Sequence, residues 1–447
     1  MFHKILIANR GEIALRIIRA CREMGINSVA VYSEADRDSL HVKLADESIC
    51  IGPAQSKNSY LNMEGIISAT IATGAEAIHP GFGFLSENSR FAEKCELCNI
   101  SFIGPPSNVI DKMGNKVEAR ITMMNAGIPV VPGSKSSLHN PREASLIADE
   151  IGFPIMIKAS SGGGGKGMRI ANSKEEFTNN FITAQLEARK AFGNDSMYLE
   201  RYVKSPHHIE FQILADKYGN IIQLGERDCS IQRHHQKIIE EAPSTILTPE
   251  LRRKMGNVAI EVANVAGYEG VGTVEFLLDE FGNYYFIEMN TRVQVEHAVT
   301  EMVSSIDIIK EQIKVAAGYP LDINQKDVRL IGHAIECRIN AENPSLNFRP
   351  CFGKISNLLL PGGNGVRIDT ALYNGYIIPP YYDSMIAKII VYDSNRIMSV
   401  EKMRSALSEV IIEGVPTNLE FLLKIITNKQ FKSGNFTTDF IENNFHL

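Results

Sequence analysis

A glycine-rich run, residues 162–167, contains four consecutive glycines followed by a lysine and a further glycine. It lies between two apolar stretches with strand character, Phe153–Ala159 and Met168–Ala171. Because ordering glycine costs more chain entropy than ordering any other residue, the run needs a compensating role. The GxGxxG spacing fits, but no helix follows, and Met168-Arg169 stands where a Walker A motif has Lys-Ser/Thr. The run therefore favours a strand–loop–strand flap whose N–H groups close over phosphates, with a flexible linker as the alternative.

Strand and helix patterns alternate along residues 1–113, which predicts βαβ units on a parallel sheet. The expected strands are Lys4–Ala8, Ser28–Tyr32, Ala75–His79 and Ile100–Ile103. A helix between the first two is expected to stop at Gly25. The first turn, Asn9–Gly11, lacks the GxGxxG fingerprint. This region is therefore expected to have the fold of a nucleotide-binding domain without its usual phosphate-binding turn.

Two further regions follow, residues 114–330 and 331–447, and they mix strands, turns and helices. For the first we expect helices at Lys116–Ala126 and after the Thr248-Pro249 start, and strands at Met197–Val203, Ile209–Ala215, Ile221–Glu226, Gly270–Leu278 and Tyr284–Asn290. The second is expected to end in helices near 400–413 and 417–428. The predicted fold class is α/β passing into α+β.

Two predicted strands joined by a turn near Phe281 carry Glu275, Glu288 and Asn290. The turn places Glu275 opposite Glu288, and Asn290, two residues further on, shares its face. Facing carboxylates repel unless a positive charge lies between them, and oxygen ligands on a stiff sheet suit Mg²⁺ or Mn²⁺. A solvated acidic sheet face is the alternative.

Alternating charges follow this hairpin directly. Arg292, Gln294 and Glu296 share one face if the segment is extended, and together they suit a small oxyanion held beside a general base. Upstream, the charged run Asp228–Lys237 is either a solvated loop or the wall of a site. Arg338 lies in another short strand, and on its own it does not indicate a function.

Charge and hydropathy exclude several classes of protein. Lys and Arg number 46 against 52 Asp and Glu, giving a net charge of −6, which argues against nucleic acid as the main partner. No apolar run approaches the ~20 residues of a membrane span. Seven cysteines, an odd number, fit reduced thiols in the cytoplasm, and we expect Cys95 and Cys98 to be plain helix residues.

The motifs together resemble biotin carboxylase, the ATP-grasp component of biotin-dependent acyl-CoA carboxylases. The matching stretches are Ile5–Arg16, His79–Asn88, Lys158–Met168, Glu226–Pro243, Phe286–Glu301, Gly332–Glu342 and Tyr381–Ile386. The resemblance implies a Rossmann-like N-terminal domain (1–113), an ATP-grasp central domain (114–330) with a mobile glycine-rich lid at about 131–203, and a mixed α+β C-terminal domain (331–447).

The family reaction implied by this resemblance has two steps. ATP and bicarbonate give carboxyphosphate and ADP, and the carboxyl group then passes to N1′ of biotin on a carrier protein. The expected cofactors are ATP and Mg²⁺ or Mn²⁺, with two ions, and biotin is the carrier-bound substrate. The expected partners are a biotin carboxyl carrier protein, carboxyltransferase subunits and a second copy of the chain in a homodimer.

The resemblance also assigns roles to residues. Nucleotide contacts fall on Lys116, Lys158, Gly164, Gly165, Glu200, Arg201, Tyr202, Val203, His208, Gln232 and His235. The metal ligands are Glu275, Glu288 and Asn290. Bicarbonate is held by Lys237, Arg292, Gln294 and Val295, Glu296 is the base, and Arg338 stabilises the biotin enolate. Arg201 and Ala298 stand where the family commonly has Lys and Pro, and Ala298 is expected to loosen the segment that carries Glu296.

The resemblance implies a subunit of acetyl-CoA carboxylase, and three alternatives are weighed against it. A subunit of another acyl-CoA carboxylase is the first, because the transferase selects the acyl group. Another ATP-grasp ligase, joining a carboxylate to an amine, shares the loop and the acidic hairpin. A non-catalytic nucleotide-binding regulator keeps the fold but is expected to lack a metal carboxylate or the base. The absence of an Ala-Met-Lys-Met biotinylation segment favours a stand-alone subunit.

Overall fold

A five-stranded parallel sheet, ordered β3-β2-β1-β4-β5, begins the chain in the computed structural model, which describes residues 1–160 and 167–445. Its elements are β1 (Lys4–Ile7), α1 (Gly11–Glu23), β2 (Asn27–Tyr32), a 3₁₀ turn (Glu34–Asp36), α2 (Leu40–Leu44), β3 (Glu47–Cys50), a 3₁₀ turn (Ser56–Asn58), α3 (Met63–Thr73), β4 (Ala77–His79), α4 (Ser89–Leu97), β5 (Ser101–Phe102) and α5 (Ser107–Gly114). The four predicted strands are confirmed. Sequence reasoning missed β3, an edge strand whose mostly exposed residues give no apolar run.

Helix α1 shows why the βαβ pattern was readable. Ile13 and Ile17 on α1 and the strand residues Ile5 and Ile7 are all fully buried and belong to one core. The helix ends before Gly25, whose φ of +70° is the left-handed conformation that glycine adopts at little cost. The predicted stop is therefore confirmed.

A small three-stranded sheet, ordered β7-β6-β8, holds the strands that flank the glycine run. The elements in this part of the chain are α6 (Lys116–Asn125), α7 (Pro141–Ile151), β6 (Ile155–Ala159), β7 (Met168–Ala171), α8 (Lys174–Phe192) and β8 (Met197–Arg201). Strands β6 and β7 pair antiparallel, as a strand–loop–strand flap requires. The loop itself, with Gly164 and Gly165, lies outside the described residues.

The largest sheet has eight strands in the order β13-β12-β9-β10-β11-β14-β21-β19, and every adjacent pair is antiparallel. Its strands are β9 (His207–Ala215), β10 (Ile221–Arg233), β11 (Gln236–Ala242), β12 (Gly270–Leu278), β13 (Tyr284–Asn290), β14 (His333–Asn340), β19 (Val366–Thr370) and β21 (Met385–Asp393). The sheet runs on past residue 330, so the predicted second and third regions share it. We keep the three domain boundaries as a proposal.

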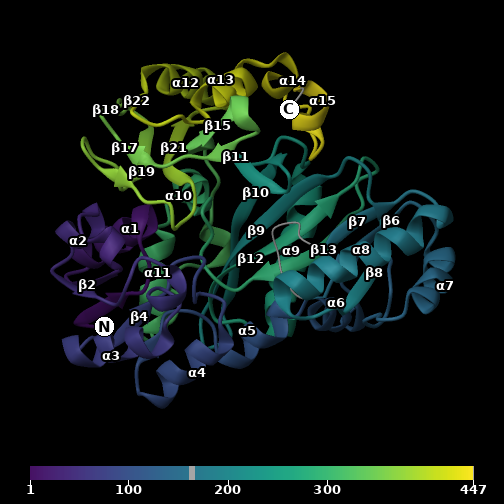
Figure 1. The fold of residues 1–447 in the computed structure, drawn as a ribbon, viewed down its shortest axis with the longest axis horizontal. Helices are drawn as coiled ribbons and strands as arrows, with labels where there is room; N and C mark the ends of the chain where they lie inside the picture. The colour runs from purple at the N-terminus through teal and green to yellow at the C-terminus, as the bar shows by residue number, and fades with distance from the viewer. Residues whose placement is uncertain (161–166, 446–447) are drawn as a thin grey trace.

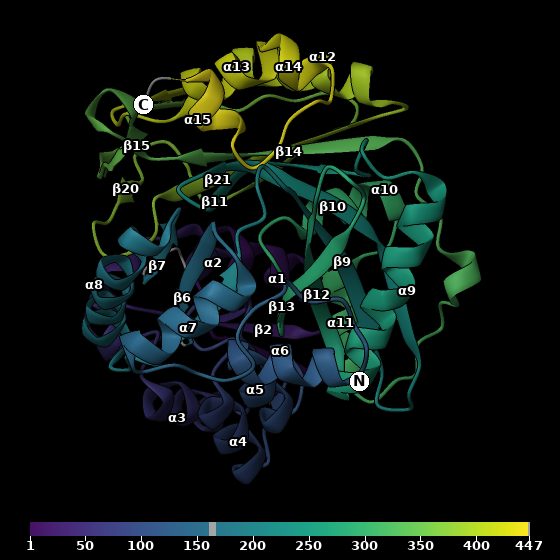
Figure 2. The same cartoon turned by 90° about the vertical axis from the view of Figure 1, so that its right-hand side faces the viewer.

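Helices and short strands complete this part of the chain. They are α9 (Pro249–Ala266), α10 (His297–Ser304), α11 (Ile308–Ala316), a 3₁₀ turn (Gln325–Asp327), β15 (Glu342–Asn343), a 3₁₀ turn (Pro344–Leu346), β16 (Arg349–Pro350), β17 (Gly353–Lys354), β18 (Asn357–Leu359), β20 (Ile377–Ile378), α12 (Arg396–Glu409), β22 (Ile411–Glu413), α13 (Leu419–Thr427), α14 (Lys429–Lys432) and α15 (Phe440–Asn444). Figures 1 and 2 show α12 to α15 over one edge of the molecule, the N-terminal sheet on another, and β6 to β8 with α7 and α8 beside the central sheet.

Two predicted boundaries are wrong. Strand β10 does not end at Glu226 but continues to Arg233, beyond a bulge at Gly225, whose φ is +90°. The helix expected near 400–413 ends at Glu409, because the next residues form β22 and pair with β18.

The cysteine prediction is confirmed, since all seven cysteines are free and Cys95 and Cys98 lie in and at the end of α4. Among the described residues, no helix combines the length and the apolar character needed to cross a bilayer.

Candidate active site

A row of charged residues crosses four neighbouring strands. Glu288 on β13 pairs in register with Glu275 on β12, and Glu275 pairs with Glu210 on β9. Glu210 in turn pairs with Arg227 on β10. Residues paired across antiparallel strands point to the same face, so the sheet gathers these four charges on one surface. The expected opposition of Glu275 and Glu288 is confirmed.

Lys237, on β11, binds three carboxylates at the centre of this surface. Its Nζ donates to Glu210 Oε2 at 2.5 Å, to Glu296 Oε1 at 2.8 Å and to Glu275 Oε1 at 3.0 Å. Burial works to lower the pKa of Lys237, but the three carboxylates overcome it and raise the pKa well above its usual range. The ammonium group is therefore charged, and it offsets the repulsion between the acids.

Glu296, immediately before α10, is held between two cations. Lys237 binds its Oε1, and Arg338 on β14 donates from Nη2 to its Oε2 at 2.9 Å. Burial works to raise the pKa of Glu296, but Lys237 and Arg338 dominate and hold the pKa well below its usual range. The side chain is almost fully buried and ionised, which is the protonation state that a general base requires.

The segment before Glu296 is not extended, which corrects the sequence interpretation. It bends at residues 291–292 and turns at 295–296. The carbonyl of Gln294 accepts hydrogen bonds from the backbone N–H and the ring Nδ1 of His297, and these bonds close the turn. Gln294 still reaches Glu275, donating from Nε2 at 2.8 Å, whereas the side chain of Arg292 binds Glu87 and Asn290. Ala298 is fully buried within α10.

Arg292 is fixed by Glu87, a residue that sequence reasoning quoted in a motif but gave no role. Arg292 Nε donates to Glu87 Oε2 at 2.9 Å, and the N–H of Thr291 donates to Glu87 Oε1 at 3.1 Å. Arg292 Nη2 donates to Asn290 Oδ1 at 3.2 Å. The N-terminal region therefore contributes a side chain to a site built mainly on the central sheet.

Arg227 is a second residue that sequence reasoning missed. Its side chain has no exposed surface, and its guanidinium bonds five acceptors. The partners are Glu210, Gln212, Thr300, Thr273 and Gln294. A buried guanidinium with all five donors used is a rigid support for the residues around it. The available signal was the alternation Glu226-Arg227-Asp228 inside a strand that continues past its bulge.

The predicted metal ligands provide a donor set that fits Mg²⁺ or Mn²⁺. Glu275 and Glu288 face each other, and Asn290 donates to Glu275 Oε1 at 2.8 Å, which brings its amide beside the carboxylates. All three offer the oxygen donors that hard divalent cations prefer. Lys116 Nζ lies 2.6 Å from Glu288 Oε2, so the carboxylate of Glu288 already binds a positively charged group.

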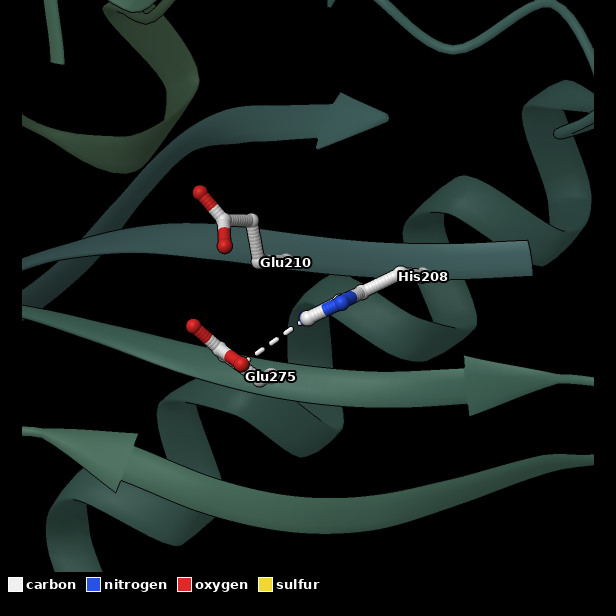
Figure 3. A group of neighbouring side chains, drawn as sticks. All are labelled: His208, Glu210 and Glu275. Carbon is white, nitrogen blue, oxygen red and sulfur yellow. Dashed lines mark hydrogen bonds and ion pairs between the residues drawn. The ribbon is translucent and has the colours of Figure 1, made fainter. Parts of the chain in front are cut away.

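A compact cluster on the same sheet includes only one of these ligands. His208, Glu210 and Glu275 bring their side-chain donor atoms within 4.8 Å of one another, as Figure 3 shows. His208 Nε2 is 2.8 Å from Glu275 Oε2, and Gln232 Nε2 is 2.7 Å from His208 Nδ1. The predicted nucleotide contacts His208 and Gln232 are thereby joined to the predicted metal ligand Glu275.

Other predicted nucleotide contacts form a separate group on the small sheet. Lys158 on β6 donates to Glu200 on β8 at 2.5 Å, and Arg120 on α6 lies 3.6 Å from the other oxygen of Glu200. The N–H of Arg201 donates to Pro132, and that of Tyr202 to Pro154, which ties the segment leading to Val203 to this part of the chain.

His235 lies near members of both groups: partial burial is the main cause that lowers its pKa, and the charges of Lys158 and His208 lower the pKa further. It forms the two-residue turn between β10 and β11 with His234, and their φ values are +62° and +49°. Both side chains are exposed, and within the described ranges no hydrogen bond or ion pair joins His235 to another predicted site residue. Positive φ at both central positions is the geometry of a tight hairpin turn.

Fold and site together define an ATP-grasp ligase: the small sheet β7-β6-β8, whose strands β6 and β7 flank the glycine run, lies beside an antiparallel sheet that presents acidic and cationic side chains. Three family models match in succession: "Biotin carboxylase, N-terminal domain" at residues 1–110, "Carbamoyl-phosphate synthase L chain, ATP binding domain" at 115–324 and "Biotin carboxylase C-terminal domain" at 336–443. The chain belongs to the biotin carboxylase family, and its activity is the ATP-dependent carboxylation of biotin.

Relatives and solved structures agree over nearly the whole chain. Biotin carboxylase 1 of Bacillus subtilis is 57% identical, with 99% of this chain and 98% of the relative covered. A pyruvate carboxylase component of Methanothermobacter thermautotrophicus is 52% identical, with 99% and 90% covered. The biotin carboxylase domain dimer of Hydrogenobacter thermophilus 2-oxoglutarate carboxylase, solved with MgADP, ADP and bicarbonate, is 52% identical with a TM-score of 0.97, covering 99% and 98%.

Proposed function

We propose that the chain carries out the first half-reaction of acetyl-CoA carboxylase, carboxylating biotin on a separate carrier protein. In the first step a bicarbonate oxygen attacks the γ-phosphorus of ATP, and ADP leaves as carboxyphosphate forms. In the second step the C–O bond of carboxyphosphate breaks and phosphate leaves; N1′ of biotin gives its proton to the departing phosphate and bonds to the released carboxyl carbon. The observation that carries the proposal is Glu296, ionised and buried between Lys237 and Arg338.

The roles of the site residues follow from this arrangement. Bicarbonate is an oxyanion, so Lys237 and Arg292 provide charge, while Gln294 and the backbone of Val295 orient it. Glu296 takes the bicarbonate proton, which makes the oxygen nucleophilic. A neutral Glu296 binds Arg338 less strongly, so the guanidinium becomes available to the enolate oxygen of biotin.

The nucleotide and metal roles rest on the same row of charges. Bound Mg²⁺ or Mn²⁺, as two ions, supplies positive charge that neutralises the phosphate oxygens. Glu275, Glu288 and Asn290 would hold these ions. The proposed nucleotide contacts are Lys116, Lys158, Gly164, Gly165, Glu200, Arg201, Tyr202, Val203, His208, Gln232 and His235.

ADP release from the purified chain tests the activity. Mg-ATP is supplied with and without bicarbonate, and with and without free biotin. We expect release to depend on bicarbonate and to be stimulated by biotin. Turnover indifferent to both would contradict the proposal and favour a carboxylate–amine ligase, and bound nucleotide without turnover would favour a regulator.

The acyl acceptor needs its own test. Similar proteins bear names of biotin, pyruvate and 2-oxoglutarate carboxylase components, so acetyl-CoA is a proposal. Labelled bicarbonate and a biotinylated carrier are combined with transferases for acetyl-CoA, pyruvate or 2-oxoglutarate. We expect the source organism's own carrier and transferase to label malonyl-CoA; label in a keto-acid product would contradict the acetyl-CoA assignment.

Assembly and location complete the proposal. A homodimer is supported by the dimer named in the Hydrogenobacter structure, and a cytoplasmic location by the reduced cysteines. Sedimentation of the purified chain tests the dimer: we expect twice the mass of one chain, 49.6 kDa.

A further inference from the structure

Arg338 has a second carboxylate partner that the reaction described above does not use. Its Nη2 forms an ion pair with Glu240 Oε1 on β11, in addition to the 2.9 Å bond to Glu296 Oε2. Strands β11 and β14 are neighbours in the sheet, and they present Glu240 and Arg338 toward each other. The same nitrogen, Nη2, therefore has two carboxylate partners, Glu240 and Glu296.

Glu240 has no exposed surface, and within the described residues Arg338 is its single ion-pair partner. The charged or titratable groups around it are Arg338, Glu336 and Cys337 from β14, Cys229 from β10, Glu296 from the start of α10, and Lys237 from its own strand. A buried carboxylate is costly to keep charged without a cation. Arg338 is thus the group that makes an ionised Glu240 possible.

We propose that Glu240 is a positioning residue that keeps Arg338 directed into the biotin site after Glu296 has taken up the bicarbonate proton. This inference rests on the proposed function. Proton uptake by Glu296 removes one anionic partner of Arg338. The Glu240 carboxylate remains, so the guanidinium keeps an anchor while its other donors turn to the biotin enolate oxygen.

Glu336 provides a matched comparison. It stands opposite Glu240 in the β11–β14 register and is equally buried, but it makes no ion pair with Arg338. Burial raises the pKa of Glu336 well above the usual range, which favours the neutral carboxyl group. A Glu336→Gln substitution keeps the side chain's shape and breaks no ion pair, whereas Glu240→Gln removes the ion-pair partner of Arg338.

Steady-state kinetics of the full chain with free biotin test the proposal. We expect Glu240→Gln to lower kcat/KM for biotin roughly tenfold, with the KM for ATP and the bicarbonate-dependent release without biotin changed less than about twofold. Glu336→Gln is expected to leave all three within about twofold. Equal effects of the two substitutions on biotin would overturn the proposal.

A double-mutant cycle separates positioning from a general structural role. If Glu240 acts through Arg338, adding Glu240→Gln to an Arg338→Gln chain changes kcat/KM for biotin by less than about twofold. A full additional loss would overturn the proposal. Wild-type protein measured in parallel distinguishes the two hypotheses: absence of biotin stimulation there contradicts the proposed function itself.

The pH profile of the wild type gives a second test, independent of whether the variant folds. Burial raises the pKa of Glu240 to about 7, with Arg338 opposing and Glu296 adding to the rise. Protonation removes the anchor, so kcat/KM for biotin is expected to fall as pH drops below about 7, while kcat/KM for ATP without biotin does not follow. Parallel profiles would overturn the proposal.

Discussion

The ammonium group of Lys237 lies 2.8 Å from Glu296 Oε1 and 3.0 Å from Glu275 Oε1, so one cation joins the proposed base to a proposed metal ligand. Neither carboxylate could remain ionised in a buried site without such a partner. The bicarbonate and nucleotide halves of the site are therefore electrostatically coupled through a single side chain.

Replacing Lys237 with Gln is expected to lower bicarbonate-dependent ADP release about 100-fold, the order of loss seen when a donor to a reacting oxyanion is removed. The measurement is initial rate against bicarbonate concentration. Lys326→Gln, on an exposed lysine, is the control and should match the wild type. An unchanged rate for Lys237→Gln would contradict its role.

Glu87→Gln is expected to raise the KM for bicarbonate about tenfold and to leave the KM for ATP unchanged. The reason is that Glu87 orients Arg292 through the 2.9 Å bond to Nε. Rates at varied bicarbonate and saturating ATP measure the effect. Glu93→Gln, on the exposed face of α4, is the control. A rise in the KM values for both bicarbonate and ATP would contradict a role limited to orienting Arg292, because the whole site would then be disturbed.

Local sequence patterns predicted the strands and the acidic hairpin because each of these depends on residues close along the chain. Glu275 and Glu288 are separated only by a turn, so alternation alone placed them opposite each other. The edge strand β3 and the far half of β10 were missed because exposure and the Gly225 bulge interrupt the apolar pattern on which such predictions depend.

Contacts between distant segments were not predictable in this way. Glu87 meets Arg292 across 205 residues, and Glu240 meets Arg338 through strand order that no local pattern reveals. The family resemblance supplied roles for residues at the site, and the structure adds the residues that hold them. Arg227, buried with five acceptors, is the clearest example.

Removal of divalent metal is expected to stop ADP release, and either Mg²⁺ or Mn²⁺ should restore it. Glu288→Gln is expected to raise the metal concentration needed for half-maximal rate by about tenfold, because one charged oxygen ligand is lost. Titration of chelator-treated protein measures this concentration. Glu280→Gln, at the exposed hairpin turn, is the control. Full activity in chelator would contradict the metal assignment.

Asp36 is expected to stabilise the protein through Arg10, which it binds at 2.6 and 2.7 Å. Burial works to raise the pKa of Asp36, but Arg10 overcomes it and lowers the pKa below its usual value of 3.8. Asp36→Asn leaves the partly buried guanidinium of Arg10 without its carboxylate partner, so we expect a loss of about 3 kcal/mol of unfolding free energy at neutral pH.

The pH dependence of that loss has a definite sign. A lowered carboxylate pKa gives stability that is present above the unfolded value and lost as pH falls through the folded one. The difference in unfolding free energy between wild type and Asp36→Asn should stay constant down to about pH 5 and become smaller below about pH 4. Urea unfolding at several pH values measures it, with the exposed Asp38→Asn as control. Narrowing already at neutral pH would contradict the assignment.

In the proposed reaction, bicarbonate deprotonated by Glu296 attacks ATP itself. Incubating the chain with Mg-ATP, biotin and bicarbonate labelled with ¹⁸O, followed by mass analysis of the released phosphate, tests this attack. We expect one bicarbonate oxygen in each phosphate, because the P–O bond formed with bicarbonate persists when carboxyphosphate breaks down. Glu296→Ala should abolish the labelled product. Phosphate whose one new oxygen comes from solvent instead of bicarbonate would contradict the direct attack of bicarbonate on ATP.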